Sequence, residues 1–312
     1  MAVPTVTLAT QIAAEVTGHR PATAHRFTTG ARHYVYEVRF ANRLPVVVRI
    51  GDRSARAEME GAVRLSGLLR PRGVRLPEIL AQSEGSELPW LVLERLSGTD
   101  LHAVIADLSC ERLDHIAEQV ARAQAITSST TSAGRYGYAA LPERAPHSAW
   151  SQVLDANLDR SWRRIESAGL FDPMLVEVVR SAVAARREEI DRIAPIPFLH
   201  DTTTKNVIVT SDGHFSGIVD VDDLCFGDPR YPAALTLAVL LAYGGPVEYV
   251  SAWLRHAKEP DDPTFRLYVS LFLLDLMAEH GQVFNGNARL SGPEVRLSLR
   301  RAFQDSLRPA IA

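Results

Sequence analysis

Hydrophobic residues recur with two different spacings along the chain, and the spacing changes near residue 96. In the first part, short β-branched or alternating runs predict strands at 34–40, 45–50, 73–81 and 90–96. Two amphipathic stretches predict helices over 5–18 and 54–69. In the second part, apolar residues mostly return every three or four positions, which predicts helices over 101–105, 112–126, 150–170, 173–194, 235–242, 246–257, 265–283 and 293–307.

These patterns predict an α+β protein with two lobes. A small β-rich N-terminal lobe would span residues 1–96, and a larger, mainly helical lobe would span residues 97–312. The segment 128–146 is rich in Ser, Thr, Gly and Pro, so it is expected to be a loop. With 312 residues the chain is long enough to give both lobes a core.

Composition and charge narrow the class of protein. The net charge of −3 argues against a nucleic-acid-binding protein, which normally has an excess of Lys and Arg. The two cysteines are far apart and fit a reducing cytoplasm. The N-terminus lacks the features of a signal peptide, and the longest apolar stretch, 267–277, is too short for a membrane span and contains Asp275. We therefore expect a soluble cytoplasmic protein with no nucleic-acid or membrane partner.

The most informative stretch runs from residue 198 to residue 229. Short β-branched runs at 207–210 and 215–219 flank the turn residues Ser-Asp-Gly-His, which predicts a hairpin whose paired residue numbers sum to about 425. Asn206 would then lie opposite Val219, with Asp220 one step further and Asp201 on the loop before the first strand. Two carboxylates and a carboxamide are thus expected at one mouth of the hairpin.

Such a group of side chains suits phosphoryl transfer. One carboxylate can accept the proton of an attacking hydroxyl, while an amide oxygen and a second carboxylate can hold Mg²⁺ against phosphates. The spacing Asp-x4-Asn, with a further Asp 19 residues after the first, resembles the aminoglycoside/choline-kinase-like phosphotransferases. This resemblance implies a bilobal protein-kinase-like fold that uses ATP, possibly GTP, and Mg²⁺. It makes Asp201 the catalytic base and makes Asn206 and Asp220 the metal ligands.

The sequence departs from the family pattern in the same stretch. The family usually shows His-Gly-Asp before the four-residue spacer and Ile-Asp-Trp at the second site. Here Leu199 takes the His position, His200 takes the Gly position, and Val221 replaces the Trp. These departures concern the shape of the loop and leave the carboxylates in place.

The resemblance also assigns roles in the N-terminal lobe. Gly30 lies in the loop that would cover the nucleotide phosphates, and Arg49 on a following strand would hold them. Pairing the strands about Asn42-Arg43 puts Arg49 opposite Tyr36. A helix carboxylate is expected to pair with Arg49, and helical spacing favours Glu58, with Glu60 as the alternative.

Further assignments concern the nucleotide base and the acceptor. Backbone groups around Glu94 and Leu96 would bind the adenine. Asp275 and Glu279 lie one helical turn apart and could bind amino groups of an acceptor, although pairing with Arg is an equally good interpretation. Asp228, in an Asp-Pro pair, is expected to be structural.

The sequence therefore predicts an enzyme that transfers the γ-phosphoryl group of ATP to a hydroxyl of a small molecule. An aminoglycoside-like antibiotic is the first candidate acceptor, and a macrolide, cyclic peptide, amino alcohol or sugar is the alternative. A nucleotide-binding pseudokinase that regulates a partner, or a structural homo-oligomer, would be other classes of function. The protein is expected to be a monomer or homodimer. A protein acceptor is disfavoured, because no Ala-Pro-Glu segment follows Asp220.

Overall fold

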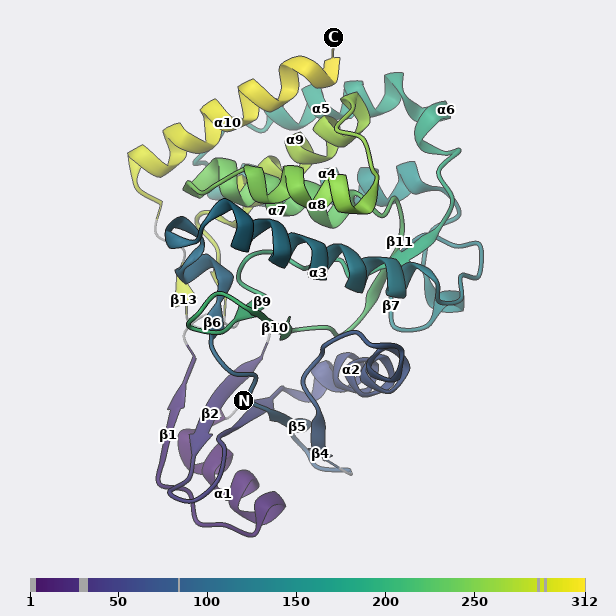
Figure 1. Cartoon of the computed structure of the whole chain (residues 1–312). Coiled ribbons are helices and arrows are strands. Elements are labelled where there is room, and N and C mark those ends of the chain that lie inside the picture. Colours follow the sequence, from purple (N-terminus) through teal and green to yellow (C-terminus); the bar gives the residue numbers. More distant parts are fainter. Residues whose placement is uncertain (1–3, 28–32, 84, 285–286, 289–290, 312) are drawn as a thin grey trace.

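The computed structural model describes residues 4–27, 33–83, 85–284, 287–288 and 291–311 (Figure 1). The N-terminal elements are α1 (Val6–Thr17), β1 (Thr23–Arg26), β2 (Tyr34–Arg39), β3 (Val46–Ile50), α2 (Arg56–Leu69), β4 (Ile79–Gln82) and β5 (Trp90–Glu94). The next elements are β6 (Thr99–Asp100), α3 (Cys110–Ser128), β7 (Gly137–Ala139), α4 (Trp150–Ala168), α5 (Met174–Ala185), α6 (Arg187–Ile190) and β8 (Ile196–Phe198). They are followed by β9 (Val207–Val209), β10 (Phe215–Ile218), β11 (Leu224–Gly227), α7 (Tyr231–Tyr243), α8 (Glu248–Ala257), α9 (Pro263–Glu279), β12 (Val283–Phe284), β13 (Asn287–Ala288) and α10 (Pro293–Ile311).

The N-terminal elements form an antiparallel sheet with strand order β1-β2-β3-β5-β4. Apolar side chains of α1 pack against one face of this sheet, where Tyr36, Val48 and Ile50 are buried. Residues of α2 form a second cluster with Leu91 of β5. Since side chains alternate along a strand, Arg49 does not share the face that α1 covers and lies with Leu91 instead.

The register of the β2–β3 hairpin differs from the prediction by one residue. Arg49 pairs with Val35, and Tyr36 pairs with Val48, so the hairpin is symmetric about Asn42. A shift of one residue moves a side chain to the other face of a sheet. The predicted partner, Tyr36, lies in the α1 core, whereas Arg49 is left on the face where α2 packs.

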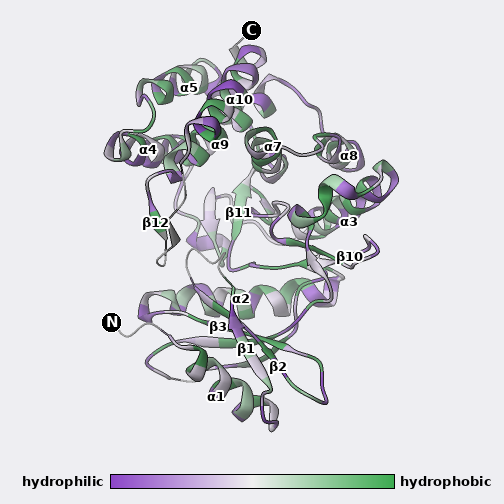
Figure 2. Cartoon of the chain, turned by 90° about the vertical axis from the view of Figure 1, so that its left-hand side faces the viewer, coloured by the Kyte–Doolittle hydropathy of each residue, from purple (hydrophilic) through white to green (hydrophobic). Residues whose placement is uncertain are grey.

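Helices make up most of the chain beyond β6, and they stack above the N-terminal sheet in Figure 1. This part of the chain also contains two three-stranded sheets, β10-β9-β6 and β7-β11-β8. The strand β11 is buried throughout and appears as a green arrow in the middle of the helical region (Figure 2). The β9–β10 hairpin lies at the side of the helical region that faces the sheet (Figure 1).

Several predicted elements change in detail. The helix expected over 173–194 is broken at Arg186 into α5 and α6, and the helix expected over 101–105 is a pair of 3₁₀ turns. The loop expected over 128–146 contains β7, which pairs with the buried strand β11. None of the helices in the described ranges has the length and hydrophobicity to cross a membrane.

Helix α2 approaches the segment after β10 so closely that one position must be glycine. A Cβ atom on Gly61 would lie 2.2 Å from the carbonyl oxygen of Asp222 and 3.0 Å from the Cβ of Ala140. We therefore expect Gly61→Ala to lower the free energy of unfolding by about 1–3 kcal/mol, because α2 and the backbone at Asp222 must separate.

In the same helix, a Cβ on Gly67 would meet nothing within 4 Å. Gly67→Ala should stabilise the protein by about 0.5–1 kcal/mol in the same denaturant titration, and equal effects of the two changes would contradict the prediction.

Candidate active site

The hairpin predicted around the turn at 211–214 is confirmed, including its register. Gly217 pairs with Ile208 and Ile218 with Val207, after a bulge next to Phe215. The backbone N–H of Val219 donates to the carbonyl oxygen of Asn206 at 2.9 Å. Asn206 and Asp220 therefore lie at the same mouth of the hairpin, as the spacing predicted.

The loop before β9 brings Asp201 to this mouth. The side-chain amide of Asn206 donates to the backbone carbonyl of Asp201 at 3.1 Å. The hydroxyl of Thr203 donates to Oδ1 of Asp201 at 2.9 Å, and the carbonyl of Thr203 accepts from the backbone N–H of Asn206. These bonds fix the Asp201 carboxylate relative to Asn206. None of these bonds uses the side-chain amide oxygen of Asn206, which can therefore accept a bond from a ligand or bind a metal ion.

Asp220 has an unusual backbone conformation and an accessible side chain. Its φ of 64° lies in the left-handed region, which Asp tolerates better than most residues. Its side chain is 55% exposed, and Oδ1 lies 3.3 Å from a guanidinium nitrogen of Arg49. Strained backbone at such a position is frequent in functional sites. The ion pair also connects the N-terminal sheet to the hairpin.

The carboxylate bound most closely to Arg49 is that of Asp222. Nη1 of Arg49 donates to Oδ1 of Asp222 at 2.6 Å, and Nη2 donates to Oδ2. This fork-to-fork arrangement is the strongest form of ion pair, and Arg49 itself is buried. Arg49, for which Glu58 was the expected partner, thus pairs with Asp222 and Asp220 of the later chain, and the charge of Glu58 also lies close to it.

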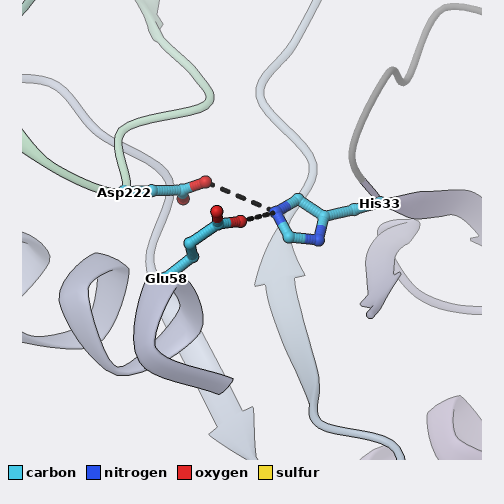
Figure 3. Close-up of side chains that lie close together, drawn as sticks. All are labelled: His33, Glu58 and Asp222. Carbon is cyan, nitrogen blue, oxygen red and sulfur yellow. Dashed lines mark ion pairs between the residues drawn. The ribbon is translucent and has the colours of Figure 1, made fainter. Parts of the chain in front are cut away.

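Glu58 nevertheless lies beside this ion pair, whereas Glu60 is exposed. Oε2 of Glu58 lies 3.3 Å from Nε2 of His33, and Oδ2 of Asp222 lies 3.5 Å from the same nitrogen (Figure 3). Burial by itself would raise the pKa of Asp222, but the nearby His33 imidazole and the charge and hydrogen bonds of Arg49 hold it well below its usual value. Asp222 therefore stays ionised at neutral pH.

One buried side chain that holds the Asp201 loop was not predicted. The amide of Gln124, on α3, donates to the carbonyl of Leu199 at 2.9 Å and to the hydroxyl of Thr202 at 3.1 Å. Its oxygen accepts from the backbone N–H of Leu199 at 3.0 Å. Leu199 is buried, so these bonds satisfy backbone groups that water does not reach. A Gln on the apolar face of a predicted helix was the available signal.

Gln124→Leu should lower the free energy of unfolding by about 1–3 kcal/mol, because it leaves those buried groups without partners. Denaturant titration measures the change. The matched control is Gln304→Leu at an exposed position of α10, for which we expect a change within about 0.5 kcal/mol. A Gln124→Leu protein as stable as the control would show that this amide does not hold the loop.

His200, at the usual glycine position, is held by two neighbours. Its Nε2 lies 2.6 Å from Oδ1 of Asp223, and its ring stacks edge-on against Tyr138 at 5.1 Å. Burial by itself would lower the pKa of His200, but the hydrogen bond and charge of Asp223 outweigh that effect and raise the pKa. The positive charge on His200 is thus favoured beside the loop that carries Asp201.

The raised pKa of His200 predicts a pH-dependent stability. A group whose pKa is higher in the folded state stabilises that state fully below its usual value of 6.5. This stabilisation is lost as the pH rises through the folded-state pKa. The difference in melting temperature between wild type and Asp223→Asn should therefore be largest near pH 5 to 6 and shrink at alkaline pH. The control is Asp212→Asn, which alters the exposed Asp212–His214 pair, and its melting temperature should stay close to that of wild type across this pH range. An effect of Asp223→Asn on the melting temperature that does not depend on pH would contradict the interpretation.

The remaining expected residues are placed as follows. Gly30 lies outside the described residues. The backbone N–H of Glu94 already donates to the carbonyl of Glu78 at 2.8 Å. Leu96 is buried at the end of this segment, and its carbonyl accepts from Arg95. Within the described chain, the N–H of Leu96 makes no hydrogen bond.

Asp275 is bound by an arginine, which is one of the two interpretations left open. Its carboxylate accepts from Arg160 at 2.7 Å and from the hydroxyl of Ser161 at 2.8 Å. Asp275 is therefore part of an ion pair between α4 and α9. Glu279 is the last residue of α9 and is partly buried.

Comparisons with known proteins identify the family of the chain. The model of the phosphotransferase enzyme family (APH) matches residues 23–268, which include Arg49, Asp201, Asn206 and Asp220. No curated protein sequence matches the chain significantly. Solved structures match it along nearly its whole length.

Three of these structures illustrate the likeness. A candidate fructosamine-3-kinase from Thermobifida fusca YX-ER1 is 19% identical over 99% of both chains, with a TM-score of 0.65. The GDP and kanamycin complex of APH(2")-IIIa is 19% identical over 97% of this chain and 95% of that one, with a TM-score of 0.65. A thermostable mutant of APH(4)-Ia, in a ternary complex with AMP-PNP and hygromycin B, is 16% identical over 96% and 99%, with a TM-score of 0.63.

At these identities the solved structures establish the fold, and the predicted kinase-like α+β fold is confirmed. The family model covers most of the chain, including the β9–β10 hairpin. The chain therefore belongs to the phosphotransferase enzyme family and is a small-molecule phosphotransferase.

Proposed function

We propose that this protein transfers the γ-phosphoryl group of ATP to a hydroxyl group of a small molecule. The observation that carries the proposal is the meeting of Asp201, Asn206 and Asp220 at one mouth of the β9–β10 hairpin, within reach of Arg49. Phosphoryl transfer needs little covalent chemistry from the protein and depends on positioning and on charge neutralisation. This arrangement supplies both.

Asp201 is proposed to orient the acceptor hydroxyl and to take its proton. Thr203 and Asn206 hold Asp201 in place, so the carboxylate is positioned before the acceptor arrives. The donor set at the hairpin mouth fits Mg²⁺, because an amide oxygen and an accessible carboxylate are hard oxygen ligands. Bound there by Asn206 and Asp220, Mg²⁺ would neutralise charge on the β- and γ-phosphates.

The nucleotide is proposed to bind between the β-rich part, residues 1–96, and the helical part, residues 97–312. Arg49 provides a buried positive charge on that side, and Asp222 fixes its orientation. The N–H of Leu96 is the better candidate for a hydrogen bond to the base, since that of Glu94 is already used. Support for a purine nucleotide also comes from the AMP-PNP and GDP in two of the similar structures.

Two classes of acceptor are proposed for the hydroxyl. Kanamycin and hygromycin B in similar structures support an aminoglycoside-like acceptor. The pairing of Asp275 with Arg160 favours the second class, a sugar or sugar–amine adduct with fewer positive charges, because Asp275 is not left to bind ammonium groups. The likeness to a candidate fructosamine-3-kinase points in the same direction.

The test is nucleotide turnover by the full chain with Mg²⁺, using ATP and GTP separately. The acceptor panel contains aminoglycosides, macrolides, amino alcohols, free sugars and fructosamine-type adducts. We expect one class to stimulate turnover and to yield a product heavier by one phosphoryl group in mass spectrometry. Nucleotide binding without turnover, with no slow hydrolysis that depends on Asp201, would favour a regulatory pseudokinase instead.

A further inference from the structure

The cluster formed by His33, Glu58 and Asp222 has a feature that the phosphoryl-transfer proposal does not use. The His33 side chain is only 4% exposed, and Figure 3 shows both carboxylates directed at its Nε2. Neither ring nitrogen of His33 makes a hydrogen bond within the part of the chain that the structure describes. An imidazole buried without a hydrogen bond is unfavourable unless something else binds its nitrogen.

The distances within the cluster match those of ligands around one metal ion. Zinc binds imidazole nitrogen and carboxylate oxygen at about 2.0–2.2 Å, so two tetrahedral ligand atoms lie roughly 3.3–3.6 Å apart. Nε2 of His33 lies 3.3 Å from Oε2 of Glu58 and 3.5 Å from Oδ2 of Asp222. All three atoms lie within 4.8 Å of one another. One ion could therefore contact all three after small side-chain rotations.

The excess of negative charge around Arg49 also favours the binding of a cation. Glu58, Asp220 and Asp222 gather around Arg49, so three carboxylates face one guanidinium. Arg49 holds Asp222 from the other side and fixes the direction of its carboxylate, as outer partners of metal ligands commonly do.

We propose that His33, Glu58 and Asp222 form a binding site for a divalent transition-metal ion of the zinc class. The imidazole selects such a metal over Mg²⁺, which prefers oxygen ligands only. This site is distinct from the proposed Mg²⁺ ligands Asn206 and Asp220. With three protein ligands, the fourth position is left for water.

The proposed site would connect three parts of the fold. His33 precedes β2, Glu58 lies on α2, and Asp222 lies between β10 and β11. The contact of Gly61 with the backbone of Asp222 already brings α2 against that segment. A bound ion would therefore fasten the N-terminal sheet and α2 to the helical region.

Isothermal titration of the chelator-treated full chain with Zn²⁺, without nucleotide, tests the proposal. We expect one ion per chain, and Co²⁺ in its place should give visible absorption bands of a four-coordinate site. Loss of an outer partner of a metal ligand usually weakens affinity about 10- to 100-fold. His33→Ala removes a ligand itself, so it should weaken Zn²⁺ binding at least tenfold.

The matched control is His25→Ala. His25 also lies beside a carboxylate, with its Nε2 3.2 Å from Glu37, but it is 52% exposed and is not part of the cluster. Zn²⁺ affinity should be unchanged in this variant. Glu58→Gln provides a second test if His33→Ala does not fold, and it should lower the affinity and remove the rise in melting temperature that Zn²⁺ causes in wild type.

Two results would overturn the proposal: no Zn²⁺ binding by wild type, or binding that His33→Ala and Glu58→Gln leave unchanged. Either would mean that the contacts between the imidazole and the two carboxylates account for the cluster without a metal ion. The readouts do not involve phosphoryl transfer, so the site can fail while the enzyme works. Asn206→Ala separates the two further, because it should impair Mg²⁺-dependent turnover and leave Zn²⁺ binding intact.

Discussion

Asp201→Asn should slow phosphoryl transfer about 10²- to 10⁴-fold, the usual contribution of a positioned general base. The substitution keeps the shape of the side chain, and its amide oxygen can still accept the hydroxyl of Thr203. The loop should therefore stay in place while the ability to take a proton is lost. The measurement is the initial rate with the acceptor found in the panel, at saturating nucleotide.

Asp212→Asn serves as the matched control for that experiment. Asp212 lies on the turn of the same hairpin, where its carboxylate accepts from Thr210 and is exposed to solvent. Its rate should equal that of wild type. A rate for Asp201→Asn within about threefold of wild type would remove Asp201 from the role of base, because general-base effects are much larger.

Asp228→Ala should lower the free energy of unfolding by about 3 kcal/mol or more. Asp228 is buried and holds Arg230 at 2.7 Å, while it also accepts from the hydroxyl of Tyr268 at 3.0 Å. Removing one partner of a buried ion pair leaves the other charge uncompensated, which typically costs about 3–5 kcal/mol. Asp262, 2.7 Å from Arg230 on its other side, retains part of the compensation. Denaturant titration gives the change directly.

Two variants sharpen this prediction. Asp261→Ala breaks the more exposed pair with Arg266 and should cost less than about 1 kcal/mol. Adding Arg230→Met to Asp228→Ala removes the stranded charge, so the double variant should be more stable than Asp228→Ala alone. If the double variant were less stable by the sum of two independent effects, the ion pair would not be the source of the loss.

Local patterns were sufficient to predict the β9–β10 hairpin and the placement of Asn206 and Asp220 at its mouth. A short turn fixes the register of the strands beside it, so Asn206 and Asp220 could be placed at one mouth from spacing alone. The β2–β3 hairpin was placed one residue out of register, since its connection is longer and its centre is Asn42. A longer loop permits several registers, and the packing of Tyr36 and Val48 against α1 selects one of them.

Contacts between distant parts of the chain could not be predicted in this way. Arg49 and Asp222 are 173 positions apart, and Gln124 and Leu199 are 75 apart. Helical spacing pointed to Glu58 as the partner of Arg49, because it considers only neighbouring elements. The carboxylate of Asp222 reaches Arg49 because α2, with Gly61 at the contact, rests directly on the backbone after β10.

The sequence by itself determined the class of fold, the positions of Asp201, Asn206 and Asp220, and the chemistry that these residue types can perform. The spacing of hydrophobic residues and the identity of turn residues depend on a few neighbouring positions, so they can be recognised in the sequence. Only the tertiary structure decided which carboxylate holds Arg49, that Asp275 is bound by Arg160, and that His33 is buried between two acids. Those outcomes depend on how the sheet, α2 and the helical region pack together, and packing joins residues that no local pattern relates.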